Sequence, residues 1–347
     1  MNAQRTLTYA AAIDEALCIA MERDPDVVTF GIGADYQSAV FGSMLQAIER
    51  FGPDRVLDTP AMENAMTGIA IGAAAAGKRP VMVHQRNDFM FLALDQLINL
   101  AAKWSYMYGE RAGKLPLVIR GVIGRGWGQG ATHSQSIQSL LAHFPGLTVL
   151  MPTTASDVKG LLLSACEADS PVILLEHRSL YNLEDAVPEG HYTTPMGTAR
   201  VARAGTDVTI AATSFMVVEA LRAADELAAR NVSAEVVDIR SIRPLDHQTI
   251  LDSVRKTGRL ICADTSWAQF GVASEVSAMV SERGFHYLKA PIIRLGMADC
   301  PSPVSHELEK VFYPSVSTIT GAVTRLLDIA HIEGVDGKYE DTFMGPY

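Results

Sequence analysis

The sequence contains few cysteines and few charged residues for its length. Four of its 347 residues are cysteine, Cys18, Cys166, Cys262 and Cys300, and no two of them form a CxxC pair. This spacing excludes a disulfide framework and a zinc site of the CxxC type, and it favours buried, reduced thiols. The charged fraction is 20%, and 39 acidic against 29 basic residues give a formal net charge of -10. Such a balance argues against general binding to nucleic acid or to a membrane surface, which requires clustered positive charge.

Long hydrophobic runs are also missing. The longest candidate, residues 67–77, ends at Lys78-Arg79-Pro80 and is too short to span a bilayer. The N-terminus has no basic region followed by an apolar core, so no secretory signal is expected. Because 48% of the residues are apolar and a domain has roughly 100–200 residues, we expect a cytoplasmic protein with about two domains, each with its own core.

Short apolar segments alternate with helical patterns along most of the chain. This alternation is typical of α/β folds in which helices cover both faces of a parallel sheet, and it predicts two doubly wound domains. A stretch without periodicity, residues 182–196, separates the two series and contains Pro188, Gly190 and Pro195. We therefore expect domains at 1–190 and 196–333, with an extended or disordered tail at 334–347. The predicted strands are 27–32, 55–57, 80–83, 117–120, 148–152, 172–175, 208–211, 234–238 and 259–262, and the predicted helices are 9–21, 43–50, 65–77, 91–108, 156–168, 217–230, 245–257 and 272–283.

Several common binding motifs are absent. The sequence has no GxxxxGK[ST] phosphate loop, no GxGxxG opening a helix after the first strand, and no HxH or HExxH. We therefore expect no metal site formed by this chain alone. The run Gly124-Arg-Gly-Trp-Gly-Gln-Gly130 is rich in glycine, which indicates a loop that closely approaches a ligand or another chain, or a plain surface loop.

Two residues stand out as candidates for acid–base chemistry. Glu63 opens a predicted helix that has no other charge before Lys78, so it is either a carboxylate favoured by the helix dipole or a partly buried group able to share a proton. His133 follows the glycine-rich run among hydroxyl and amide residues, and it is either a proton-transfer group or a polar surface residue. In the second half, the sequence predicts that Glu219, Asp264 and Glu275 are solvated or interface charges.

Ordered strings across more than 300 residues give the chain a family resemblance. It resembles the beta subunit of the thiamin-diphosphate-dependent decarboxylating component of 2-oxoacid dehydrogenases, as in pyruvate, branched-chain and acetoin dehydrogenases. The strings are Arg55-Val-Leu-Asp-Thr-Pro60 with Glu63, Leu94-Asp-Gln-Leu-Ile-Asn99, Ala101-Ala-Lys103, His133-Ser-Gln135, Pro145-Gly-Leu-Thr-Val149, Asp157-Val-Lys-Gly-Leu161, Ser170-Pro-Val-Ile-Leu-Leu-Glu176, Ile239-Arg-Ser-Ile-Arg-Pro-Leu245 and Gln269-Phe-Gly-Val-Ala-Ser-Glu275.

The resemblance implies a fold and a set of site residues. The fold is an N-terminal pyrimidine-binding α/β domain followed by a C-terminal transketolase-type α/β domain. Glu63 matches the glutamate that hydrogen-bonds the aminopyrimidine ring and so promotes loss of the thiazolium proton. Phe89 matches the aromatic residue that stacks on that ring, and Gln85 lies near it as a further cofactor-binding residue. His133 matches the histidine that lines the active-site channel and assists acyl transfer.

The same resemblance implies a partner. The family binds the diphosphate and Mg2+ through a Gly-Asp-Gly motif, which this sequence lacks. The chain is therefore expected to require an alpha subunit that supplies the diphosphate half of the site and most of the Mg2+ ligands, usually in an α2β2 heterotetramer. A lipoyl acyltransferase is a further possible partner.

The sequence departs from the family pattern near the expected substrate pocket. His84, Arg86 and Arg125 stand where relatives have other residues, and we expect them to favour an anionic or hydroxylated substrate. A salt bridge from Arg86 to Asp88 or to the alpha subunit is an equal alternative. Because of these departures, a split transketolase-like or acyloin-forming carboligase, which transfers a two-carbon unit, remains the alternative to an oxidoreductase; a silent scaffold subunit is a third class.

Overall fold

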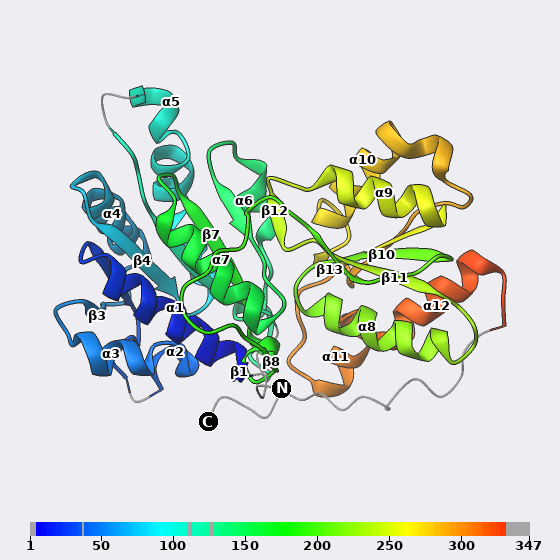
Figure 1. Cartoon of the computed structure of the whole chain (residues 1–347), viewed down its shortest axis with the longest axis horizontal. Helices are drawn as coiled ribbons and strands as arrows, with labels where there is room; N and C mark the ends of the chain where they lie inside the picture. Colours follow the sequence, from blue (N-terminus) through cyan, green and yellow to red (C-terminus); the bar gives the residue numbers. More distant parts are fainter. Residues whose placement is uncertain (1–4, 37, 110–112, 125–127, 331–347) are drawn as a thin grey trace. The chain divides into compact units, whose positions relative to one another are not determined.

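The computed structural model describes residues 5–36, 38–109, 113–124 and 128–330, and the chain divides into two compact units (Figure 1). Within these described ranges, the first unit comprises the residues between 5 and 124 and residues 140–196. The second comprises residues 128–139 and 197–330. The segment that carries His133 therefore belongs to the second unit although it is embedded in the sequence of the first, which the sequence did not indicate.

The first unit is built on a parallel sheet with the order β6-β7-β5-β4-β2-β3. Its central strands are buried on both faces, as their continuous apolar runs predict. Helix α1 packs against α7 and α3, while α4 packs against β4. The strands are β2 (Val27–Gly31), β3 (Val56–Asp58), β4 (Arg79–His84), β5 (Val118–Ile123), β6 (Thr148–Leu150) and β7 (Val172–His177), and the helices are α1 (Tyr9–Arg23), α2 (Ala39–Gly42), α3 (Leu45–Phe51), α4 (Glu63–Ala75), α5 (Trp104–Tyr108), α6 (Gln138–His143) and α7 (Ala155–Glu167).

Local chemistry explains where these elements begin and approach one another. The Thr8 side chain accepts a hydrogen bond from the Ala11 amide and caps α1, as the sequence predicts. At Gly31 an added Cβ would lie 2.4 Å from the Val83 carbonyl oxygen, so only glycine allows β2 to lie this close to β4. The carboxyl ends of these two strands therefore meet tightly, beside the start of α4.

The stretch 91–108 is helical, as predicted, but it is not one regular α-helix. The chain forms a 3-10 helix (Asn87–Ala93), a π-helix (Asp95–Ala101) and then α5. The Ala102 amide bonds the Leu97 carbonyl five residues back, which widens the turn. Gly146 approaches the Ala102 carbonyl so closely that a Cβ would lie 1.8 Å from its oxygen. The irregular turn is therefore in contact with Gly146, and the hydrophobic periodicity of the sequence does not reveal a contact between residues so far apart.

The stretch expected to lack regular structure also contains a strand. β8 (Glu184–Ala186) pairs with β1 (Thr6–Thr8) in a small antiparallel sheet. Strands β5 and β7 of the main sheet carry a fully buried ion pair, in which Arg120 Nε lies 2.6 Å from Glu176 Oε1. The Tyr181 hydroxyl and the Ser43 hydroxyl complete this network. Polar interactions thus link strands β5 and β7 inside an apolar core.

The second unit is built on a sheet with the order β14-β13-β10-β11-β9, parallel except for β9. Helix α8 packs against α12 over a core that includes Ile210, Val217, Val236 and Ile319. The elements are β9 (Arg200–Arg203), β10 (Val208–Ala212), α8 (Phe215–Ala228), β11 (Ala234–Asp238), β12 (Ser241–Arg243), α9 (His247–Thr257), β13 (Leu260–Trp267), α10 (Val272–Gly284), β14 (Ile293–Met297), α11 (His306–Phe312) and α12 (Val316–Leu327), with 3-10 helices at Gly130–Thr132, Arg178–Leu180 and Phe285–Tyr287 across the two units.

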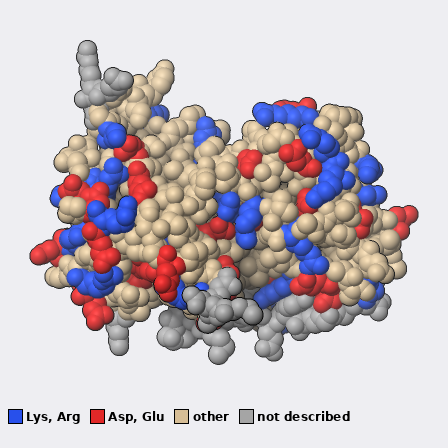
Figure 2. Space-filling model, viewed as in Figure 1, with Lys and Arg blue, Asp and Glu red and all other residues tan. Residues whose placement is uncertain are grey.

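Two expectations about individual side chains are corrected. Cys18, Cys166 and Cys262 are buried, as predicted, but Cys300 is exposed. Asp264 and Glu219 are buried rather than solvated, because each accepts hydrogen bonds from neighbouring groups. On the surface, Lys and Arg side chains gather over α9 and α10 (Figure 2). Within the described ranges, no helix is both long and apolar enough to cross a bilayer.

Candidate active site

Glu63 is the first residue of α4 and lies partly buried. It is the only charged residue of this 13-residue helix, whose remaining residues are Ala, Gly, Ile, Met, Thr and Asn. The positive end of the helix dipole favours a carboxylate at this position. The carboxylate therefore stands at the end of an almost uncharged helix, where few side chains compete for a polar ligand.

A cavity of about 530 Å³ opens beside Glu63. Apolar side chains form much of its wall, and the amides of Asn64 and Gln96 add polar groups. At Gly68 an added Cβ would lie 3.2 Å from Gln96 Oε1, so a glycine here lets the π-helix lie close to α4. The complete lining is Ala61, Met62, Glu63, Asn64, Ala65, Gly68, Leu92 and Gln96.

The buried side of α4 connects this cavity to the end of β4. Thr67 lies one turn after Glu63, and its hydroxyl is 3.4 Å from Nε2 of His84, the last residue of β4. His84 is only 4% exposed, and burial lowers its pKa from 6.5 to about 4. At neutral pH the imidazole is therefore uncharged, so His84 acts as a hydrogen-bonding group and not as the positive charge that an anionic substrate would require.

Gln85 follows directly and is partly exposed. It lies near Gly33, where an added Cβ would be 3.7 Å from Gln85 Nε2. The Gly33 amide donates a 2.7 Å hydrogen bond to Asp58 Oδ1 at the end of β3. Asp58 thus fixes the loop after β2 beside Gln85, a function that the sequence alone did not indicate.

Phe89 and Arg86 lie in the segment that follows β4. Phe89 is 38% exposed, which is high for a large aromatic residue and leaves part of its ring available for stacking. Its amide donates to the Arg86 carbonyl at 3.2 Å. The Arg86 side chain is buried, and its guanidinium carbon lies 5.7 Å from the centre of the Phe41 ring. The Phe89 ring and the Arg86 guanidinium therefore have different environments only three residues apart.

His133 belongs to the second unit and is described there by itself. It follows the 3-10 helix Gly130–Thr132, is partly buried, and has its Nδ1 2.9 Å from the Thr132 hydroxyl. Gln138 anchors the same segment, because its Nε2 donates to Asp264 Oδ1 at 2.7 Å. Burial raises the pKa of Asp264, against the opposing effect of its hydrogen bonds from Thr213, Gln138 and the Val272 amide. No pattern in the sequence indicates this connection.

The first unit therefore brings Glu63, His84, Gln85, Arg86 and Phe89 onto neighbouring elements at the carboxyl edge of its sheet. Arg125 lies outside the described residues. The neighbours that the sequence did not predict are Asn64, Leu92 and Gln96 in the cavity wall, and Phe41 beside Arg86.

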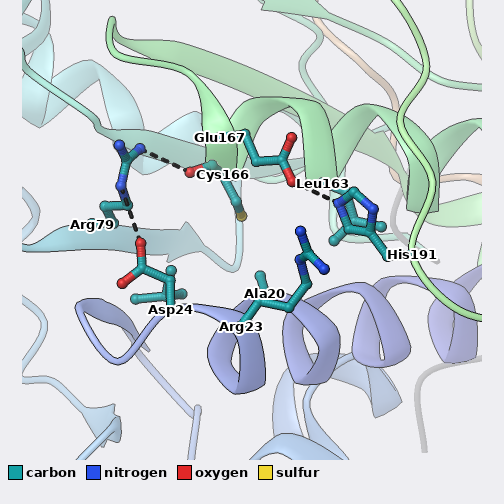
Figure 3. A pocket seen from close by; sticks show the side chains of 9 residues that line it. Ala20, Arg23, Asp24, Arg79, Leu163, Cys166, Glu167 and His191 are labelled. Carbon is teal, nitrogen blue, oxygen red and sulfur yellow. Dashed lines mark hydrogen bonds and ion pairs between the residues drawn. The ribbon is translucent and has the colours of Figure 1, made fainter.

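A second cavity, of about 240 Å³, lies between α1 and α7 and is lined by other residues (Figure 3). An ion pair and a hydrogen bond shape it: Arg79 Nε lies 3.3 Å from Asp24 Oδ2, and His191 Nε2 lies 2.6 Å from Glu167 Oε1. Arg79 Nη1 also donates to the Cys166 carbonyl at 3.1 Å, near the end of α7. These contacts join α1, β4 and α7, and they give this cavity a structural role in the first unit.

Comparison with known proteins covers nearly the whole chain. The family described as "Transketolase, pyrimidine binding domain" matches residues 5–184, and the family described as "Transketolase, C-terminal domain" matches residues 197–319. The chain is 41% identical over 332 residues to the beta subunit of acetoin:2,6-dichlorophenolindophenol oxidoreductase of Cupriavidus necator, covering 93% of this chain and 98% of the relative.

Two further similarities agree with this one. The chain is 41% identical over 327 residues to the mitochondrial pyruvate dehydrogenase E1 component subunit beta-2 of Oryza sativa subsp. japonica, covering 93% of this chain and 87% of the relative. A solved structure titled as a split-gene transketolase, an inactive beta4 tetramer, superposes with a TM-score of 0.74 at 24% identity, covering 93% of this chain and 99% of that one. At that identity the superposition shows the fold alone.

Proposed function

The chain belongs to the transketolase-like family of 2-oxoacid dehydrogenase beta subunits, and from this membership we propose that Glu63 and its cavity hold the aminopyrimidine ring of thiamin diphosphate. The observation that carries this proposal is the position of Glu63, which opens an otherwise uncharged helix on the wall of a cavity. The expected reaction is decarboxylation of a 2-oxoacid followed by transfer of the acyl group to a lipoyl acceptor.

The residues present fit the proposed cofactor. An aminopyrimidine is a flat heteroaromatic ring with nitrogen donors and acceptors. It requires a carboxylate at one ring nitrogen, an aromatic or aliphatic face, and amides at its edge. Glu63 supplies the carboxylate, the partly exposed Phe89 supplies a face for stacking, and Gln85, directly after β4, supplies an amide.

In this arrangement the chain's own residues hold and move protons. When bound, thiamin diphosphate supplies the nucleophilic carbon and the electron sink for decarboxylation. The Glu63 carboxylate would hold the aminopyrimidine by sharing a proton with a ring nitrogen. Once a partner covers the exposed apolar walls, they would exclude water from this hydrogen bond and strengthen it. In the second unit, His133 can donate a proton toward oxygen that gains charge during acyl transfer.

We further propose that an alpha subunit completes the site. The sequence lacks the Gly-Asp-Gly motif, so the partner would supply the diphosphate contacts and Mg2+ ligands, in an α2β2 assembly. The surface around the cavity supports this: Met62, Ile69 and Leu92 are 57%, 56% and 60% exposed. Exposed apolar side chains gathered around a cavity are typical of a partner interface. We assign this α4 surface to the alpha subunit.

The test of the catalytic proposal is Glu63→Gln in the enzyme reconstituted with its alpha subunit. Loss of the ionisable carboxylate should lower kcat by about 100-fold or more, while the subunits still assemble. Glu49→Gln, a change at an exposed glutamate of α3, is the matched control and should leave kcat unchanged. Near-normal turnover of the Glu63 variant would contradict the proposed role. Reductive acylation of a lipoyl domain by the wild-type pair would establish the acceptor.

A further inference from the structure

Two buried arginines lie against one phenylalanine ring in the first unit. The guanidinium carbon of Arg178 is 4.6 Å from the centre of the Phe41 ring, and that of Arg86 is 5.7 Å from it. The exposed fractions of Arg86 and Arg178 are 7% and 6%. Arg178 also lies 4.9 Å from the ring of Tyr181. Such cation–π contacts help to hold guanidinium groups in place.

The position of this pair in the fold is that of a binding site. Arg86 is two residues beyond β4 and Arg178 is the first residue beyond β7, and β5 separates these parallel strands in the sheet. Both side chains therefore arise at the carboxyl edge, where open α/β sheets bind ligands. Arg86 is also three residues before Phe89, which joins this pair to the proposed pyrimidine pocket through one short segment.

The electrostatics of the pair favour an anion. Burial lowers the pKa of both arginines, that of Arg178 to about 10. The negative charge of Asp88 opposes the lowering at Arg86, whereas the positive charge of Arg86 adds to the lowering at Arg178. Both groups remain protonated at neutral pH. An oxyanion between them would offset the repulsion, and the planar fork of a guanidinium matches a carboxylate or a phosphate with two hydrogen bonds.

Phe41 lies in a strained turn. Ala39, Val40 and Phe41 have φ values of 38°, 51° and 58°, in the left-handed region that side chains with a Cβ rarely adopt. Each such residue costs roughly 1 kcal/mol or more. Strain of this kind concentrates at ligand clamps and switches, and here it holds the ring against both guanidinium groups.

We propose that Arg86 and Arg178 form an oxyanion subsite, covered by Phe41, that binds a second anionic group, a carboxylate or a phosphate, at the end of the 2-oxoacid distant from its keto carbon. This inference rests on the proposed function, since it assigns the substrate class of that site. The carboxylate next to the keto group is a poor occupant, because it leaves as carbon dioxide and two arginines bound to it would stabilise the ground state against decarboxylation.

The test compares three substrates with the reconstituted enzyme: 2-oxoglutarate, 2-oxo-4-phosphonobutanoate and the uncharged-end analogue 2-oxopentanoate. For the wild-type enzyme, kcat/KM should be about tenfold or more higher for one of the two anionic substrates than for 2-oxopentanoate. The preferred anionic substrate then shows whether the subsite binds a carboxylate or a phosphate. Arg178→Met should reduce that preference by about tenfold, and Arg178→Lys should retain part of it. A ratio taken within one preparation is independent of the fraction of folded enzyme. Equal use of all three substrates by the wild type, or an unchanged ratio in Arg178→Met, would overturn the subsite.

Controls separate this proposal from the proposed function. Arg203→Met removes a β9 arginine that pairs with Asp225 and should leave the substrate ratio unchanged. Exchange of the C2 proton of thiamin diphosphate in the wild-type assembly, followed by NMR, tests the proposed function without any 2-oxoacid. Calorimetric titration of the full chain with glutarate and with inorganic phosphate tests the subsite without catalysis. About tenfold weaker binding to Arg178→Met supports the subsite, and equal binding overturns it.

Discussion

The hydroxyl of Thr67 lies 3.4 Å from Nε2 of His84, and this contact joins the helix that begins with Glu63 to the strand that ends before Gln85. Both side chains are buried. The Thr67 hydroxyl also lies 3.6 Å from Sδ of Met82 on the same strand. One hydroxyl therefore connects two elements that adjoin the proposed cofactor-binding residues. Its loss should affect the cofactor site as well as folding.

We expect Thr67→Val to lower the free energy of unfolding by about 1 kcal/mol, because the change keeps the volume and removes the bond to His84. The apparent affinity for thiamin diphosphate should also fall. Thr320→Val is the matched control, since Thr320 is a buried threonine in α12 bonded to the Ser317 carbonyl. The control should affect stability while leaving the cofactor concentration at half-maximal activity unchanged; an equal shift in both variants would refute the connection.

His84 should make the protein less stable in mild acid. Its folded pKa of about 4 lies below its ordinary value of 6.5, so between these values the unfolded chain binds a proton that the folded chain does not. Stability is therefore fully present above pH 6.5 and is lost as the pH falls toward 4, by up to about 3 kcal/mol. Urea unfolding at pH 7.5, 6 and 5 measures this slope, and His84→Gln should be less sensitive to pH than the wild type.

Replacing one residue of the buried pair Arg120–Glu176 should lower the free energy of unfolding more than replacing both. Burial lowers the pKa of Arg120, but the attraction of Glu176 outweighs this and leaves it raised. Arg120→Met should cost about 3–5 kcal/mol, because it leaves Glu176 buried without its countercharge, whereas replacing both residues by Met should cost less. Lys310→Met, which breaks an exposed i,i+3 pair with Glu307, should cost less than about 1 kcal/mol. Chemical denaturation compares all three variants, and equal losses in the single and double variants would contradict the argument.

Gln138→Leu should loosen the segment that carries His133. The change removes the 2.7 Å bond to the buried Asp264 carboxylate, which should cost about 1–3 kcal/mol. Hydrogen exchange of the amides over residues 130–139 should become faster. Gln248→Leu, at an exposed position of α9, is the control. Unchanged protection of residues 130–139 would show that other contacts hold this segment.

The α4 surface gives a test of assembly. Ile69→Asp places a charge on an exposed apolar side chain beside the Glu63 cavity and should prevent stable association with the alpha subunit. Leu45→Asp alters an aliphatic residue of similar exposure on α3 and should leave association intact. Size-exclusion chromatography of the mixed subunits distinguishes the two outcomes.

The sequence predicted the parts of the fold that depend on local pattern. Apolar runs such as Val172–Leu175 identify buried strands, and Thr8 identifies the start of a helix. The parts that it missed depend on contacts between distant residues. Asp264 reads as a surface charge until its donor Gln138, 126 residues earlier, is placed beside it. Arg178 follows a strand and resembles an ordinary loop residue in the sequence, but the sheet brings it to the same Phe41 ring as Arg86. His84 was expected to favour an anionic substrate, but burial, which also depends on distant residues, keeps its imidazole neutral.

The distribution of thiols has a practical consequence. Burial raises the pKa of Cys18 to about 11 and those of Cys166 and Cys262 to about 12, so at neutral pH these three react slowly with alkylating reagents. Cys300 is the exposed member of the set. The native chain therefore already suits attachment of one fluorophore by maleimide chemistry, at a position in the second unit, without any engineered cysteine.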